Sequence, residues 1–289
     1  MPASNSPLRT DLKLSMPFSN VLHLPFPEKL RATRLAGFSQ LALQPQEVQR
    51  ICAAGTPLKM IRQMAADEGI AISRLDPLCT WNPHWHPDNM NEAFVADHSM
   101  SAEVFFKLCE TLGCSHMSLN ATFAHTRYSL AEQVELYAQI CSRAAEHGLV
   151  CDLEPIPMWG VRSLEQGWEI IKQAGSPNGG LVLDTLHFMR SNSSVRALAK
   201  IPGAMIHCVQ LCDGIHPLPA DVSLEQDCFN RLWPGEGNFP LAQIIAQLDT
   251  MGALNEVGPE VFSANNSALC AEQVASACCA SLARYPAFG

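Results

Sequence analysis

Residues 150–187 read V-C-D-L-E-P-I-P-M-W-G-V-R-S-L-E-Q-G-W-E-I-I-K-Q-A-G-S-P-N-G-G-L-V-L-D-T-L-H. A strand-like apolar run at 150–155 is followed by a helical pattern at 163–174, and a second strand-like run follows at 181–187. Two short strands joined by a helix predict a right-handed unit with parallel strands. The fold prediction depends on how far this pattern extends.

The same alternation of short strands and longer helices continues in both directions through the 289 residues. Eight strands in a chain of this length predict a closed (β/α)8 TIM barrel, with an open doubly wound sheet as the alternative. We expect a single domain over residues 1–289, because no long linker divides the sequence. The predicted strands span 12–17, 38–43, 70–76, 116–122, 150–155, 181–187, 206–213 and 259–263, and the predicted helices span 27–36, 46–67, 102–113, 129–147, 163–174, 194–200, 239–251 and 267–284.

The composition is that of a globular protein, with 47% apolar residues, 16% charged residues and a net charge of −9. This acidic balance argues against nucleic acid or an anionic membrane surface as a partner. No apolar run reaches the roughly 18 residues of a membrane span, and residues 1–14 lack the apolar core of a secretory signal. Twelve scattered cysteines without a C-x-x-C pair indicate reduced thiols. We therefore expect a cytoplasmic protein.

Polar residues stand on four consecutive predicted strands, at the end where a TIM barrel carries its function. Glu154 and Asp184 lie late in the fifth and sixth strands, Gln210 lies in the seventh, and Glu260 opens the eighth. An isolated carboxylate in an apolar strand is unfavourable to bury unless it is paired or binds a metal. The four oxygen donors predict one divalent-metal site that suits Mn²⁺ or Mg²⁺. The competing interpretation is that each residue bonds to a loop or to backbone amides separately.

Five segments in the second half of the chain carry a family pattern: L-E-P at 153–155, L-V-L-D-T-L-H-F at 181–188, V-Q-L-C-D-G at 209–214, R-L-W-P-G-E-G at 231–237 and E-V-F-S at 260–263. Their order and spacing resemble the xylose isomerase-like TIM barrel superfamily, the sugar phosphate isomerase/epimerase group. The resemblance implies a divalent metal held by Glu154, Asp184, Gln210 and Glu260.

Gln210 departs from the ketose 3-epimerase branch of that superfamily, in which the ligand on the seventh strand is a histidine. The chain looks similar to dehydroshikimate-dehydratase-like members in having glutamine there. An amide oxygen favours Mn²⁺, Mg²⁺ or Co²⁺ over Zn²⁺, and we put Mn²⁺ first. His207 is close in sequence, but strand alternation predicts that it faces away from the side on which Gln210 lies.

The resemblance also implies that His187 and Arg231 contact the substrate. Pro234 and Gly235 predict a turn beside Arg231, from which the guanidinium reaches a substrate hydroxyl, carboxylate or phosphate. The alternative for Arg231 is a surface ion pair.

The stretch 79–98 is rich in proline, asparagine and histidine, and we predict a long loop over the barrel mouth. Trp81 and His86 in this loop are expected to bind the substrate, together with Asn120 at the end of the fourth strand. An ordered surface loop without a binding role is the competing interpretation. His84 and His86 form an H-x-H, but two histidines alone make a poor metal site.

The expected chemistry is proton abstraction next to a carbonyl through an enediolate, with Glu154 and Glu260 as the catalytic pair. A proton returned to the substrate makes the enzyme an isomerase or epimerase of a keto-sugar or its phosphate, the function we put first. Loss of a β-hydroxyl makes it a dehydratase of a hydroxylated keto acid such as 3-dehydroshikimate. A non-catalytic barrel that binds a small molecule is the alternative from another class. A homo-oligomer is compatible with the sequence.

Overall fold

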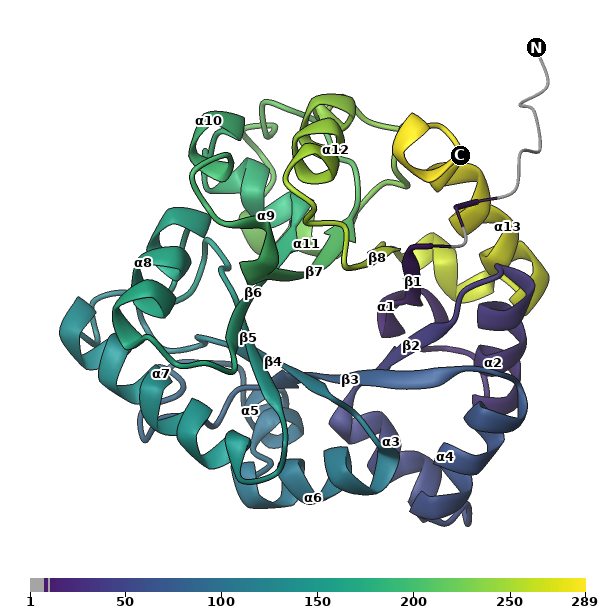
Figure 1. Ribbon diagram of the computed structural model, residues 1–289, viewed down its shortest axis with the longest axis horizontal. Coiled ribbons are helices and arrows are strands. Elements are labelled where there is room, and N and C mark those ends of the chain that lie inside the picture. Colours follow the sequence, from purple (N-terminus) through teal and green to yellow (C-terminus); the bar gives the residue numbers. More distant parts are fainter. Residues whose placement is uncertain (1–7, 10) are drawn as a thin grey trace.

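The computed structural model describes residues 8, 9 and 11–289; residues 1–7 and 10, which include much of the stretch predicted to lack a signal, lie outside the described residues. Eight parallel strands form a closed barrel in sequence order, which confirms the TIM-barrel prediction over the open sheet (Figure 1). The strands are β1 (Lys13–Met16), β2 (Gln40–Leu43), β3 (Ala71–Leu78), β4 (His116–Asn120), β5 (Val150–Glu154), β6 (Gly179–Asp184), β7 (Ile206–Leu211) and β8 (Glu256–Pro259).

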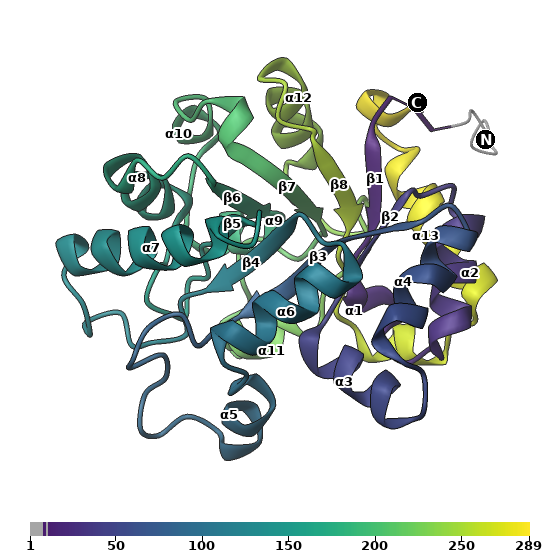
Figure 2. The same ribbon diagram turned by 60° about the horizontal axis from the view of Figure 1, so that its bottom comes forward.

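Helices surround the barrel (Figure 1). Apolar side chains fill the space between the helices and the strands. The loops that follow the strands carry the short helices α1 (Phe18–Val21), α5 (Glu92–His98) and α11 (Leu224–Cys228), which lie where the strands end (Figure 2). The α-helices are α1 (Phe18–Val21), α2 (Phe26–Leu35), α3 (Pro45–Ala53), α4 (Leu58–Asp67), α5 (Glu92–His98), α6 (Ala102–Leu112), α7 (Leu130–Ala145), α8 (Leu164–Ala174), α9 (Thr185–Arg190), α10 (Val195–Leu198), α11 (Leu224–Cys228), α12 (Leu241–Thr250) and α13 (Ala271–Leu282).

The predicted position of the eighth strand was wrong. β8 spans Glu256–Pro259, so Glu260 follows the strand instead of opening it. The strand reads E-V-G-P, and glycine and proline are typical of turns, which hid it from the sequence pattern. Glycine is required at position 258, because a Cβ there would overlap the carbonyl oxygen of Ser15 on β1.

Three other segments differ from the prediction. The helix predicted over 46–67 is two helices, because Pro57 has no backbone N–H and begins α4 as its N-cap. The sixth strand ends at Asp184, and the residues after it form α9. The predicted loop 79–98 contains α5, which Asn91 caps by accepting hydrogen bonds from the backbone N–H groups of the first turn.

Charged side chains point into the barrel interior, where they form layers along the barrel axis. Arg74 on β3 is fully buried and lies 3.1 Å from Asp152 on β5 and 3.4 Å from Glu256 on β8. Residues two positions further along a strand face the same side. Asp76 and Glu154 therefore lie one layer nearer the carboxyl ends of the strands than Arg74 and Asp152.

All twelve cysteines are free, and most of them are buried. Among the described residues, we find no helix with both the length and the apolar character that a membrane span requires.

Candidate active site

Strand register brings the predicted site residues together at the carboxyl ends of the strands. Asn120 on β4 pairs with Glu154 on β5, and Asp184 on β6 pairs with Gln210 on β7. The backbone N–H of Glu260 donates to Leu211 O at 2.7 Å, which places Glu260 at the end of β7 and β8. All five side chains are buried. These positions agree with the prediction that the residues share one end of the barrel.

Asp184 is held by the start of its own helix. Its Oδ1 accepts hydrogen bonds from the backbone N–H groups of Leu186 at 2.7 Å and His187 at 3.2 Å, so Asp184 is the N-cap of α9. Oδ2 is left to face the other site residues. The His187 ring lies near this carboxylate, with its Nε2 3.9 Å from Asp184 Oδ2 and 3.6 Å from Glu154 Oε1.

Arg231 is buried and lies within the carboxyl cluster. Its Nη1 is 2.6 Å from Asp184 Oδ2 and 2.9 Å from Glu260 Oε2, and its Nε donates to Cys228 O at 3.0 Å. The alternative of a surface ion pair is therefore wrong. The turn at 231–237 is tied to β7 by Asp213, whose Oδ2 accepts from the backbone N–H of Gly235 at 3.0 Å.

Gln210 points into the barrel, as strand alternation predicts. Its Nε2 donates to Asp76 Oδ2 at 3.2 Å and to Glu260 Oε1 at 3.0 Å. Its Oε1 is a buried oxygen without a hydrogen-bond partner among the described residues. A free buried acceptor is unfavourable, because it has lost its hydrogen bonds to water without replacement. A cation would satisfy this oxygen.

Asp76 is a site residue that the prediction missed. It is buried near the end of β3, and its carboxylate accepts from Gln210. The signal was present in the sequence, because S-R-L-D-P-L at 73–78 places one acid at the end of the third predicted strand.

Burial shifts the protonation of the cluster. Burial, followed by the negative charges of Asp76, Glu260 and Asp184, raises the pKa of Glu154 well above its usual value. Burial likewise raises the pKa of Glu260, although Arg231 opposes the shift.

Asp184 and His187 respond differently to the same surroundings. Burial opposes ionisation of Asp184, but Arg231 and His187 outweigh it, so the pKa of Asp184 lies below its usual value. Burial lowers the pKa of His187 to about 4, against the attraction of Asp184. Asp184 is therefore ionised and His187 neutral near pH 7.

The residues fit a divalent cation. Asp76, Glu154, Asp184 and Glu260 are four buried carboxyl groups around one guanidinium, so full ionisation leaves an excess of negative charge. Without a cation, protons must neutralise some of these groups, as the raised pKa values of Glu154 and Glu260 indicate. Glu154, Asp184 and His187 each offer a ligand atom, and these atoms lie within 4.8 Å of one another.

The three residues expected to bind substrate beyond His187 and Arg231 have different surroundings. Trp81 is buried beside the site, and its Nε1 donates to Asn120 O at 2.8 Å. Asn120 Oδ1 is buried without a hydrogen-bond partner among residues 8, 9 and 11–289. His86 is half-buried and contacts its own loop, with its ring against Trp85 and its Nδ1 2.8 Å from Pro87 O. The contacts of His86 thus give it no connection to the carboxyl cluster.

His207 lies elsewhere than strand alternation predicts. The register between β6 and β7 shifts at His207, because Leu181 pairs with Ile206 and Val182 with Cys208. His207 therefore reaches Asp152 near the amino-terminal end of the barrel, at 2.6 Å. The ligand assignment to Gln210 is unaffected, since His207 lies in the other layer.

A closed (β/α)8 barrel with a buried, carboxyl-rich site at the carboxyl ends of its strands defines the class of protein. The chain belongs to the xylose isomerase-like TIM barrel family, which matches residues 30–278. This match confirms the resemblance that the sequence motifs indicated.

Two named relatives are enzymes. A 3-dehydroshikimate dehydratase from Pseudomonas aeruginosa is 29% identical over 245 residues, which cover 82% of this chain and 36% of the dehydratase. An inosose isomerase from Bacillus subtilis is 26% identical over 171 residues, which cover 57% of this chain and 60% of the isomerase. The chain thus spans less than two thirds of the length of either relative.

Solved structures support the fold. A crystal structure of the IOLI protein with a bound zinc atom has a TM-score of 0.79 to this chain at 20% identity, and the match covers 92% of this chain and 95% of that one. The shared barrel agrees with the strand order described above.

Proposed function

We propose that this barrel is a divalent-metal-dependent lyase that removes water from a cyclic hydroxy-keto acid of the 3-dehydroshikimate class. The observation that carries the proposal is Gln210, whose Nε2 bonds to Asp76 and Glu260 while its Oε1 stays free. Dehydratase-like members of the family resemble this chain at that position. The similarity to a 3-dehydroshikimate dehydratase over 82% of the chain supports the same assignment.

The ion would be held by Glu154, Asp184, Gln210 and Glu260. When bound, a divalent cation supplies Lewis-acid polarisation of a substrate carbonyl. Mn²⁺ is our first choice, with Mg²⁺ and Co²⁺ as alternatives, because the four donors are oxygen atoms.

The residues of the chain would handle the protons. Glu154 accepts the proton next to the carbonyl, and the electron pair of that C–H bond moves into the substrate. The same pair then expels the β-hydroxyl group, which takes up a proton and leaves as water. His187, 3.6 Å from Glu154 Oε1, would orient that carboxyl group, and Glu260 would supply the proton that the leaving hydroxyl group takes up.

Arg231 would position the site and contribute positive charge. It contacts Asp184 and Glu260 at once, so it fixes two of the proposed ligands relative to each other. In this proposal Arg231 would contact the substrate, and so would Trp81, Asn120 and His86.

A second candidate is an isomerase or epimerase that acts on a cyclic or open-chain keto-sugar. The similarity to an inosose isomerase over 57% of the chain favours it. In that case Glu154 and Glu260 would remove and return a proton without loss of water.

Two assays distinguish the lyase from the isomerase. The purified protein, reconstituted with Mn²⁺, Mg²⁺ or Co²⁺, is incubated with 3-dehydroshikimate, and the aromatic product is followed by its ultraviolet absorbance. A parallel reaction with inosose in D₂O is followed by NMR for deuterium uptake and isomerisation. Aromatisation supports the lyase, while exchange with inosose alone would replace it with the isomerase. No reaction with either compound by metal-loaded protein contradicts both.

A further inference from the structure

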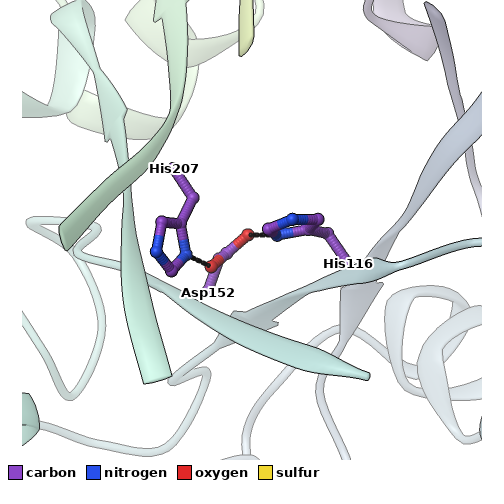
Figure 3. Close-up of side chains that lie close together, drawn as sticks. All are labelled: His116, Asp152 and His207. Carbon is purple, nitrogen blue, oxygen red and sulfur yellow. Dashed lines mark hydrogen bonds and ion pairs between the residues drawn. The ribbon is translucent and has the colours of Figure 1, made fainter. Parts of the chain in front are cut away.

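A second group of potential metal ligands lies at the other end of the barrel. His116 begins β4, Asp152 lies in β5, and His207 lies at the start of β7 (Figure 3). Asp152 is two residues before Glu154 on its strand, so this cluster belongs to the layer beneath the candidate active site. None of its three residues takes part in the proposed reaction.

The two histidines converge on one carboxylate. His116 Nδ1 is 2.8 Å from Asp152 Oδ2, and His207 Nδ1 is 2.6 Å from Asp152 Oδ1 (Figure 3). The three potential ligand atoms lie within 4.8 Å of one another. Each imidazole therefore directs a ring nitrogen at a different oxygen of the same fully buried side chain.

The cluster is accessible from outside the barrel. A cavity of about 440 Å³ at the amino-terminal end is lined by both histidines together with Ser73, Ser115 and Glu256. The histidine side chains are 25% and 22% exposed, while Asp152 is 0% exposed. An ion from solvent can reach the imidazole rings, and the carboxylate lies directly behind them.

Carboxylates outnumber guanidinium groups in this layer. Arg74 lies 3.1 Å from Asp152 and 3.4 Å from Glu256, so one guanidinium faces two carboxylates. The hydrogen bond to Asp152 raises the pKa of His207. Either a proton on this ring or a cation bound between the histidines and Asp152 offsets the remaining negative charge.

β6, which lies between β5 and β7 in the barrel, leaves room for the site. A Cβ at Gly180 on β6 would overlap the His207 ring and come within 2.9 Å of Asp152 Oδ1. The absence of a side chain at this position lets His207 approach the carboxylate from β7.

We propose that His116, Asp152 and His207 form a binding site for a divalent transition-metal ion of the Zn²⁺ class at the amino-terminal end of the barrel. Two imidazoles and one carboxylate are a ligand set that Zn²⁺ accepts, with water completing the coordination. This donor set differs from the oxygen-rich set at the carboxyl end, so the two sites prefer different metals.

Occupation requires the three ligand atoms, which now lie within 4.8 Å of one another, to adopt the spacing set by a bound ion. Ligand atoms on one tetrahedral zinc lie about 3.3 Å apart, since Zn–N and Zn–O bonds are about 2.0–2.2 Å long. The present separations of 2.6 and 2.8 Å are hydrogen bonds that must lengthen as the ion replaces the Nδ1 protons. The partial exposure of both rings allows that movement.

The test is zinc stoichiometry in a background that weakens the other site. Gln210→Ala protein is dialysed against buffered Zn²⁺, and its zinc content per chain is measured by elemental analysis. The same measurement is made after adding His116→Gln and His207→Gln together, and after adding each alone. Circular dichroism checks that each variant folds. If the double variant does not fold, the two single variants provide the comparison.

The control is His147→Gln in the same background. His147 Nδ1 is 2.6 Å from Glu110 Oε1 on the surface, so it is a histidine–carboxylate pair without a second histidine. We expect about one zinc per chain in the Gln210→Ala and His147→Gln proteins, and at least about tenfold weaker binding after loss of either cluster histidine. Zinc content that is unchanged by the cluster substitutions, or absent from the Gln210→Ala background, overturns the proposal. Neither result depends on the reaction proposed above.

Discussion

Arg231 Nη1 lies 2.6 Å from Asp184 Oδ2, so the guanidinium is bonded to a proposed metal ligand. The same nitrogen lies 2.9 Å from Glu260 Oε2. One buried cation therefore spans two carboxylates at the ends of β6 and β8. This arrangement links the stability of the metal-free protein to the geometry of its candidate site.

Replacing Arg231 by methionine should strongly destabilise the metal-free protein at neutral pH. The change leaves two buried carboxylates without their partner, and breaking a buried ion pair in this way costs about 3–5 kcal/mol. Urea unfolding of both proteins measures the difference. Mn²⁺ should restore part of the lost stability, because it replaces the missing positive charge.

The matched control is Arg31→Met. Arg31 also spans two carboxylates, those of Glu28 and Glu272, but on the exposed surface of α2 and α13. Exposed pairs contribute little, so we expect no measurable change. Equal destabilisation by the two substitutions would show that burial of Arg231 has no special role.

Glu154→Gln should abolish turnover and leave the protein folded. The amide keeps the size of the side chain but cannot accept the substrate proton, so kcat/KM should fall by about 10²–10⁴-fold or more. The melting temperature should stay close to that of the wild type, since burial already disfavours the charged form of Glu154. Glu135→Gln, on the exposed surface of α7, is the control. Full activity of the Glu154→Gln protein would exclude this carboxyl group as the base.

Asp76 should act through Gln210. Its Oδ2 accepts from Gln210 Nε2 at 3.2 Å, so Asp76→Ala frees the amide to rotate away from the site. Loss of such a supporting hydrogen bond typically weakens metal binding by about 10–100-fold. Asp76→Asn keeps an acceptor oxygen and should recover most of the affinity. Mn²⁺ titration of the three proteins gives the comparison, and equal affinity in all of them would contradict the positioning role.

The stability of α5 should decrease in mild acid. Burial lowers the pKa of His98, whose ring stacks on Phe94 with centroids 4.0 Å apart. A folded pKa below the unfolded value of about 6.5 means that the helix is fully stable above that pH and loses stability as the pH falls through the folded pKa. The protection factors of the α5 amides, which are corrected for the slower intrinsic exchange in acid, should therefore fall by at most about tenfold per pH unit. His98→Gln should remove this dependence, whereas His84→Gln, in the exposed part of the loop, should keep it.

The barrel was predictable because alternation of strands and helices is a property of the whole chain. Individual boundaries depend on local tertiary contacts instead. β8 was misplaced because Gly258 is selected by contact with Ser15 on β1, which the local sequence does not show. α9 begins at Thr185 because the Asp184 side chain caps it, which ends the apolar run early.

The candidate site was predictable to the extent that strand ends could be found. Glu154, Asp184, Gln210 and Glu260 were identified as isolated polar residues near those ends. The orientation of His207 was not predictable, because it depends on a register shift between β6 and β7. The single domain over 1–289, the cytoplasmic location, the homo-oligomer and the roles of individual site residues stay predictions.

The metal content of the purified protein after reconstitution with Mn²⁺ tests the central claim most directly. It is measured for the wild type, for Gln210→Ala and for the control Gln173→Ala, whose side chain bonds to Glu169 on the exposed face of α8. We predict about one tightly held Mn²⁺ per chain in the wild type and the control, and clearly weaker binding in Gln210→Ala. An absence of bound Mn²⁺, Mg²⁺ and Co²⁺ in the wild type would contradict the metal site. The non-catalytic binding barrel would then replace the enzyme.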